Sequence, residues 1–257
     1  GALICLLAYG VCLGFRLLEI PAWGASAFQF NDQYLMATHD AYVWLAGAEE
    51  INRKTGAALS VVLRFFHDVT GLNVANIGFW LPAIFAPLAA VPLALLAWKE
   101  KQPEAGLVSG IMAASCLGFL LRSRVGFIDT DVLALFFPIA IACGLFVWLS
   151  ALSRNSWLPA KKLEARAPRN YVLLLIGAVG IGLLVQGYDY FYGKIQIALA
   201  LEGIAFLLGL ILTSKQRLRQ FIFAFCVLLV TSFGGWIGLI LGLLGCGLAL
   251  YRPILWE

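Results

Sequence analysis

Two short acidic stretches contain the residues whose types and spacing are suited to chemistry. In the later stretch, Asp129 and Asp131 lie one residue apart, just after Arg122 and Arg124. In an extended or turned chain, two carboxylates so spaced converge on one hard divalent cation, and Mg²⁺ or Mn²⁺ needs further oxygen ligands. Asp40, in the earlier polar stretch, is the candidate for that additional carboxylate. We therefore expect the two stretches to meet and form a metal site.

The same residues are also suited to purely structural roles. Asp131 precedes the apolar run that begins at Val132 and fits the start of a helix, where a carboxylate compensates the helix dipole. Asp40 fits the cap of a helix that begins at Ala41, and capping is compatible with metal binding. Arg124 is interpreted as an anchor at the membrane interface. The spacing of these residues alone does not decide between the structural roles and metal binding.

Composition indicates the class of protein to which these acidic residues belong. The chain of 257 residues is 62% hydrophobic and 12% charged, whereas a soluble domain has about a quarter charged residues. Several apolar runs exceed the roughly 18 residues that indicate a transmembrane helix. We predict an all-α, polytopic transmembrane protein with no nucleic-acid partner. The six cysteines all fall in apolar runs and are interpreted as packing residues.

The order of apolar and polar segments predicts one transmembrane domain, residues 1–257, with a large first external loop. Its expected parts are a first span (1–20), the first external loop (21–71) with amphipathic helices at 39–53 and 57–69, spans two and three (72–121), an external loop (122–131) and the remaining spans (132–257).

Finer expectations concern single positions. Arg16 and Glu19 are interpreted as interfacial side chains that reach toward water. An aromatic turn is expected at 187–194 after a fifth span. Gly234–Trp236 is expected to divide the long run 221–251, with one long tilted helix as the alternative. Glu202 is a buried acid in the sixth span whose role the sequence leaves open.

Loop charges predict which face carries the acids. Alternate loops around Lys99, in 154–170 and in 214–220 together carry ten Lys or Arg residues against three Glu. Positive loops stay in the cytoplasm, so both acidic stretches are expected outside it. We expect an integral protein of the bacterial inner membrane with its active-site face in the periplasm; the lumen of the endoplasmic reticulum and the cell exterior are the alternative compartments.

The two stretches resemble motifs of one enzyme family. Arg122, followed by Gly126-Phe127-Ile128-Asp129-Thr130-Asp131, resembles the signature of the catalytic subunit of the oligosaccharyltransferases, the membrane enzymes of protein N-glycosylation. Ala37-Thr38-His39-Asp40-Ala41-Tyr42-Val43-Trp44 resembles the first external loop of that family. The order of elements agrees over roughly residues 1–150, although His39 stands where Asn or a small polar residue is expected.

The resemblance implies a reaction and a role for each residue. An oligosaccharide passes from a polyprenyl-pyrophosphate carrier to the Asn amide of an Asn-x-Ser/Thr acceptor polypeptide, with Mg²⁺ or Mn²⁺ as the metal. Asp40 is implied to be a metal ligand that also contacts the acceptor amide, and Asp129 to be the second ligand. Asp131 is implied to contribute more weakly to the metal, and Arg122 to orient the carboxylates.

The family also implies parts that this sequence does not contain. These are a later external loop with a catalytic glutamate and a soluble domain with a Trp-Trp-Asp motif. We therefore expect this chain to be the N-terminal part of a longer enzyme and to lack transferase activity on its own. The alternatives are another membrane glycosyltransferase that uses a polyprenyl-phosphate sugar and, from a different class, a transporter with Asp129, Arg122 and Glu202 on its path.

Overall fold

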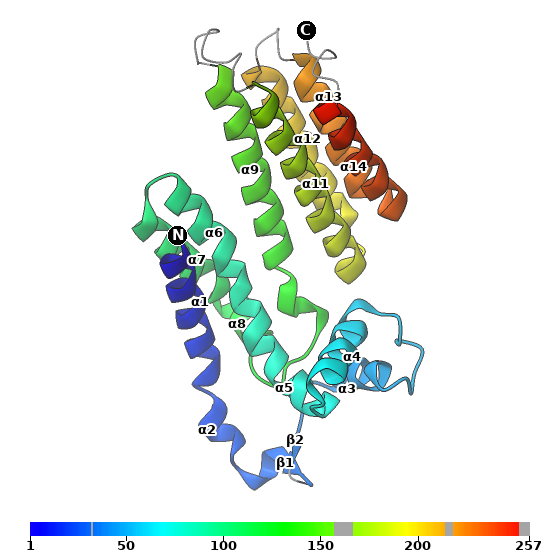
Figure 1. Cartoon of the computed structure of the whole chain (residues 1–257). Helices are drawn as coiled ribbons and strands as arrows, with labels where there is room; N and C mark the ends of the chain where they lie inside the picture. The colour runs from blue at the N-terminus through cyan, green and yellow to red at the C-terminus, as the bar shows by residue number, and fades with distance from the viewer. Residues whose placement is uncertain (32, 157–166, 214–217, 252–257) are drawn as a thin grey trace. The chain divides into compact units, whose positions relative to one another are not determined.

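The structure is a computed structural model that describes residues 1–31, 33–156, 167–213 and 218–251 (Figure 1). It is almost entirely helical, which confirms the predicted all-α polytopic class. Among the described residues, five helical segments are long and apolar enough to cross a membrane: Ala2–Trp23, Val74–Lys99, Thr130–Ala151, Leu173–Tyr192 and Ile195–Leu212. The chain forms two compact units, Gly1–Ile139 and Ala140–Glu257, and each is described by itself.

The first unit contains both acidic stretches. Its helices and strands are α1 (Ala2–Leu17), α2 (Ile20–Trp23), η1 (Ser26–Phe28), β1 (Gln29–Phe30), β2 (Gln33–Tyr34), α3 (His39–Ala48), α4 (Ala58–Thr70), α5 (Val74–Phe85), η2 (Ala86–Ala89), α6 (Ala90–Lys99), α7 (Pro103–Ala114), α8 (Leu117–Leu121) and η3 (Thr130–Leu133). The strands pair antiparallel, with Gln29 opposite Tyr34 and Phe30 opposite Gln33.

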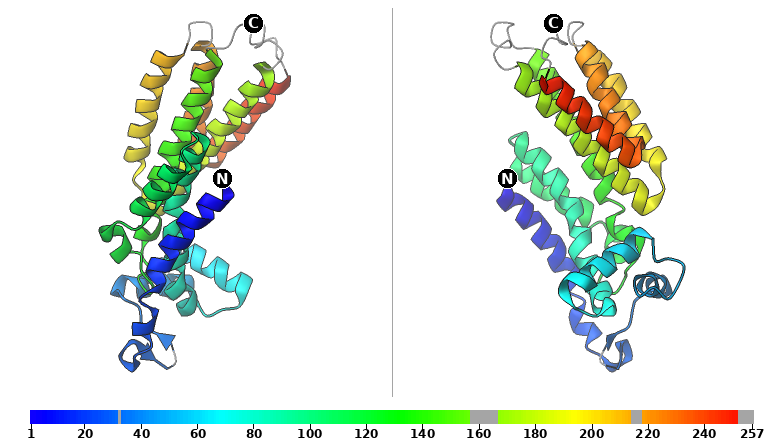
Figure 2. Two further views of the ribbon diagram at one scale, coloured as in Figure 1. Left: turned by 90° about the vertical axis from the view of Figure 1, so that its left-hand side faces the viewer. Right: turned by 45° about the vertical axis from the view of Figure 1, so that its right-hand side comes forward.

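Small residues allow the helices of the first unit to approach closely. Ala8, Ala90, Ala94 and Ala114 are fully buried in one cluster that joins α1, α6 and α7, and Figure 2 shows α1 alongside the α6–α7 pair. A Cβ atom added at Gly110 would lie 2.8 Å from the carbonyl oxygen of Ala90. Such contacts stabilise helix packing in a membrane, where lipid tails remove the hydrophobic drive for association.

Two predicted spans of this unit have interrupted helices. The span at Val74–Lys99 passes through the 3₁₀ segment η2, which contains Pro87, because proline has no N–H to donate to the preceding turn. The expected third span breaks at Ser115 into the 12-residue α7 and the 5-residue α8. Neither helix alone is long enough to cross a membrane. The continuous helix in residues 105–121 is therefore shorter than the sequence indicated.

Where it is described, the second unit consists of helices joined by short connections. They are α9 (Phe136–Ser156, which enters this unit at Ala140), α11 (Ala167–Tyr192), α12 (Ile195–Leu212), α13 (Leu218–Phe233) and α14 (Gly235–Tyr251). Trp148 of α9 donates from Nε1 to the Leu174 carbonyl of α11 at 2.9 Å. Glu202 of α12 is 1% exposed and accepts a hydrogen bond from Ser232 of α13 at 2.6 Å.

Two expectations about this unit have opposite outcomes. The break at Gly234–Trp236 is confirmed, and Gly235 adopts the positive φ of 54° that ends α13. The prediction of an aromatic turn at 187–194 is wrong, because α11 continues to Tyr192. The side chain of Tyr188 is buried in this helix, with 3% of its surface exposed. Most basic residues of the two long loops, among them Lys161 and Lys215, lie outside the described residues, so membrane sidedness stays a prediction.

Candidate functional site

Gly126 joins the two acidic stretches at the level of the backbone. Its N–H donates to the Phe79 carbonyl of α5 at 2.9 Å, and its carbonyl accepts from the Ala37 N–H at 2.8 Å. Gly126 has a φ of 72°, and an added Cβ atom would lie 3.1 Å from the ring of Trp23. A side chain is therefore disfavoured by both conformation and space. The predicted meeting of the two stretches thus has a backbone hydrogen bond at its centre.

An aromatic cluster packs beneath this junction. Tyr34 stacks on Phe79 with ring centroids 4.3 Å apart, and Trp23 meets the same ring edge-on at 5.1 Å. Phe79 is 1% exposed and Trp23 is 8% exposed. Because offset and edge-on aromatic pairs add about 0.5–1.5 kcal/mol to area burial, this cluster fixes the position of the Phe79 carbonyl to which Gly126 is bonded.

Arg16 holds the start of the second stretch from inside the unit. It is fully buried, and its guanidinium donates to the Ser123 carbonyl at 3.0 Å and to Ser123 Oγ at 2.7 Å. Its remaining hydrogen bonds reach the carbonyls of Cys12 at 3.0 Å and Ala114 at 2.8 Å. The interpretation of Arg16 as an interfacial side chain is wrong, because backbone and hydroxyl oxygens surround it and replace its water.

Asp129 caps the short helix η3. Its Oδ1 accepts from the Thr130 N–H at 2.7 Å and lies 3.3 Å from the Thr130 hydroxyl. Its Oδ2 lies 3.8 Å from Nη2 of Arg122, and the side chain is 15% exposed. The sequence assigned this capping role to Asp131, which the structure places inside the first turn instead. Asp129 therefore has one oxygen fixed by the cap and the other turned to a cation.

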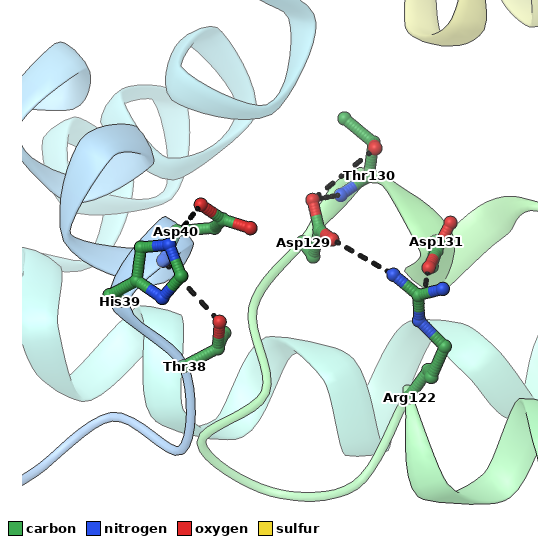
Figure 3. Close-up of polar contacts among 7 residues, drawn as sticks. All are labelled: Thr38, His39, Asp40, Arg122, Asp129, Thr130 and Asp131. Atoms are coloured by element: carbon green, nitrogen blue, oxygen red, sulfur yellow. Dashed lines mark hydrogen bonds and ion pairs between the residues drawn. The ribbon is translucent and has the colours of Figure 1, made fainter.

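Arg122 and Asp131 form the tighter ion pair of the stretch. Nε of Arg122 lies 2.6 Å from Oδ2 of Asp131, with the two side chains 61% and 30% exposed. The angle is not that of a hydrogen bond, and within the described residues this Oδ2 has no hydrogen-bond partner. Arg122 thus contacts both carboxylates of the Asp-Thr-Asp, as Figure 3 shows, which is the contact that the expected orienting role requires.

Asp40 lies in the first turn of α3, and Thr38 rather than Asp40 caps that helix. The Thr38 hydroxyl accepts from the Asp40 N–H at 3.3 Å, because Thr38 is the last residue with extended backbone. The helix is anchored by Ala41 and Leu45, which are buried. The Asp40 side chain is 55% exposed, lies 3.2 Å from His39 Nε2, and points toward the loop of Asp129 in Figure 3.

The donors at this site are hard oxygens suited to a small set of metals. Asp40 and Asp129 offer carboxylates from two elements, whereas Asp131 is engaged by Arg122. Over the described ranges, no group of three or more Asp, Glu, His or Cys side chains is placed to hold an ion. Mg²⁺ is commonly held by one or two carboxylates together with water and substrate phosphates. The residues present therefore fit an ion that a phosphorylated substrate helps to bind.

Sequence reasoning missed two residues that position this site. Ser123 is buried and links Arg16 to the Phe119 carbonyl, to which its hydroxyl donates at 2.6 Å. Arg16 had one signal, a charge within an apolar run, and such charges are costly unless they have partners inside the protein. Ser123 had none, because a serine between two arginines is ordinary in a loop.

Comparisons with known proteins identify the family of the chain. The family model described as "Oligosaccharyl transferase STT3, N-terminal" matches residues 54–249, which include Arg122, Asp129 and Asp131, while Asp40 lies before the match. Undecaprenyl-diphosphooligosaccharide–protein glycotransferases of two Campylobacter jejuni strains, serotype O:2 and RM1221, are each 27% identical over 131 residues. That similarity covers 46% of this chain and only 18% of each relative. The family match extends over most of the sequence, and the chain belongs to the oligosaccharyl transferase STT3 family.

Proposed function

We propose that this chain supplies part of the active site of an enzyme that transfers an oligosaccharide to protein. The donor is a glycan on a polyprenyl pyrophosphate, and the acceptor is the side-chain amide of Asn in an Asn-x-Ser/Thr sequence. The single observation that carries the proposal is the junction at Gly126, which joins the Asp40 stretch to the Asp129 stretch. Family membership supplies the reaction class.

The two carboxylates suit the acceptor side of this reaction. A carboxamide nitrogen is a weak nucleophile because its lone pair is delocalised into the carbonyl. Asp40 accepts a hydrogen bond from the amide N–H, orients the nitrogen and takes the proton as the N–C bond forms. As that bond forms at the anomeric carbon, the bond from this carbon to the pyrophosphate oxygen breaks, and the carrier leaves as its pyrophosphate.

The proposed metal fits the donor side. We propose that Asp40 and Asp129, with Asp131 as a weaker contributor, would hold Mg²⁺ or Mn²⁺, and that the bound ion would supply positive charge to the departing pyrophosphate. Arg122 fixes the orientation of Asp129 and Asp131 through its contacts at 3.8 and 2.6 Å. Its positively charged guanidinium also limits the net negative charge of the site.

The proposed setting is a bacterial inner membrane with this site on the periplasmic face. Its support is the excess of Lys and Arg in the alternate loops of the sequence. Substituted-cysteine labelling at Asn52, in the loop between α3 and α4, measures the sidedness. A membrane-impermeant maleimide is expected to react there in intact spheroplasts.

The experiment for the reaction uses the full-length protein that the gene encodes. Asp40→Asn and Asp129→Asn are expected to lower transfer to an Asn-x-Thr peptide at least about 100-fold, the usual scale for losing a positioned acid–base group. Binding of Mn²⁺, followed by electron paramagnetic resonance without substrate, is expected to weaken in both variants. Asp68→Asn, on the exposed end of α4, is the matched control and is expected to leave both measurements unchanged.

The outcomes separate the parts of the proposal. Wild-type transfer rates in both variants would overturn the assignment of these carboxylates. Loss of transfer with unchanged Mn²⁺ binding would support the acceptor role of Asp40 and would show that Asp40 is not a metal ligand.

A further inference from the structure

A cavity lies beside the Ala37–Gly126 junction, with Ala37 among its lining residues. It has a volume of about 610 Å³, and its walls include the side chains of Trp23, Phe28, Leu35 and Met36, with Glu19 and Arg124 among its polar residues. Cavities of about 300–1,000 Å³ are typical of sites for small molecules. Its aromatic and aliphatic walls suit an apolar chain and not a sugar or a nucleotide.

Two opposite charges in this cavity are not satisfied by one another. Nη1 of Arg124 lies 3.9 Å from Oε2 of Glu19, which is too long for a hydrogen bond, and the two side chains are 38% and 36% exposed. Nε of Arg124 is buried and, in the part of the chain that the structure describes, donates to no acceptor. A buried N–H without an acceptor is uncommon and indicates a missing partner. The cavity therefore offers a cation and an anion whose long ion pair leaves both free to form shorter hydrogen bonds with a ligand.

The position of the cavity restricts which molecules can reach it. Glu19, Ala22 and Trp23 belong to the end of the first membrane segment, Ala2–Trp23. The cavity thus lies where the membrane segment ends, at the level of lipid headgroups, where aromatic side chains such as Trp23 are frequent. The molecules with apolar chains that are concentrated at this level are the phospholipids.

We propose that this cavity binds a phospholipid whose headgroup carries both a phosphate and a primary ammonium, as in phosphatidylethanolamine. The phosphate accepts hydrogen bonds from the exposed part of the Arg124 guanidinium, and the ammonium donates to Glu19. The upper part of an acyl chain packs against Trp23, Phe28 and Leu35. A phosphate alone leaves Glu19 facing another anion, and a quaternary ammonium has no N–H to donate, so the charge pair selects the primary amine.

The proposed lipid site is lined by residues adjacent in sequence to those of the candidate active site. Leu35, Met36 and Ala37 form one wall and lead directly to Thr38 and Asp40, while Arg124 lies two residues before Gly126. A bound lipid therefore restrains both segments that the Ala37–Gly126 hydrogen bond joins. The inference depends on the cavity and its charges alone and does not rest on the proposed transfer reaction.

Native mass spectrometry of the full-length protein tests the proposal. The protein is delipidated and titrated with phosphatidylethanolamine, phosphatidylglycerol or phosphatidylcholine of identical acyl chains. We expect phosphatidylethanolamine to bind about tenfold more tightly than either of the others, the factor for one charge-assisted hydrogen bond. Glu19→Gln is expected to lower its affinity to that of phosphatidylglycerol, and Arg124→Gln to weaken both of these lipids alike. Arg53→Gln, an exposed arginine of the same unit, is the matched control and is expected to change neither.

Three results would overturn the proposal. Equal affinity for the three lipids would show an unselective lipid shell. A preference for phosphatidylethanolamine that survives both Glu19→Gln and Arg124→Gln would place the lipid elsewhere. Competition by soluble phosphoethanolamine at the affinity of the whole lipid would exclude any contribution from the apolar walls. Thermal unfolding of each variant, compared with the Arg53→Gln control, shows that it is folded before the lipids are ranked.

Discussion

Two arginines hold the same stretch of chain in opposite ways. Arg16 is fully buried and donates to Ser123 and to two further carbonyl oxygens, and within the described residues it forms no ion pair. Arg122 is the neighbour of Ser123 in sequence, has a side chain 61% exposed, and contacts the carboxylates of Asp129 and Asp131. Arg16 therefore determines where the loop lies, whereas Arg122 acts on the carboxylates with which the loop binds its proposed ligands.

The surroundings of each arginine explain this division. A buried guanidinium loses its water, and only a complete set of acceptors offsets that cost. Arg16 obtains its acceptors from α1, α7 and Ser123, so its position is fixed by the packing of three segments. Arg122 retains contact with water and its ion pairs are screened, so it can respond to a metal or an anionic substrate with little change elsewhere.

The largest effect on stability is expected for Arg16→Met. Methionine fills much of the volume but leaves the carbonyls of Ala114 and Ser123 without their donor, at a cost of about 3–5 kcal/mol in the free energy of unfolding. In a chain of this size the apparent Tm falls by roughly 10 °C. Heating in detergent followed by size-exclusion chromatography measures the change.

Arg16→Lys is the second variant in case the first does not accumulate in the membrane. An ammonium donates to some of the same oxygens but cannot reproduce the planar fork, so we expect an intermediate loss of Tm. A Tm for Arg16→Met equal to that of the wild type would show that the network around Ser123 does not stabilise the loop.

A smaller loss of stability, about 2 kcal/mol, is expected for Gly126→Ala. The left-handed conformation at φ 72° costs an alanine roughly 1–2 kcal/mol, and the added methyl contacts Trp23 and Phe79. The junction with Ala37 is therefore displaced. We expect the transfer rate of the full-length protein to fall by a larger factor than the loss of stability alone would explain. Gly118→Ala, where an added Cβ atom meets nothing within 4 Å, is the control and tests whether any glycine change in this region has the same result.

The sequence located the charged residues of this region but not the residues that hold them in place. Asp40, Asp129 and Arg122 are recognisable because charged residues at fixed spacing are rare in an apolar chain. Arg16 was misinterpreted because distance along the chain does not reveal that α7 and Ser123 surround it. The same limit explains α11, whose extension through Tyr188 depends on a buried face that no local pattern marks.

The smallest effect on stability, and the most specific one on function, is expected for Arg122→Gln. Exposed ion pairs contribute about 0–1 kcal/mol, so the Tm should stay within about 2 °C of the wild type. Without its cation, however, Asp129 and Asp131 repel one another and lose their common orientation. We therefore expect transfer to fall about 10–100-fold, while Arg53→Gln, at an exposed arginine of the same unit, leaves it near the wild-type rate. Equal losses of Tm in Arg122→Gln and Arg16→Met would remove the distinction between the two arginines. If Arg122→Gln alone impairs transfer at an unchanged Tm, the exposed arginine acts on the site and the buried one on the fold.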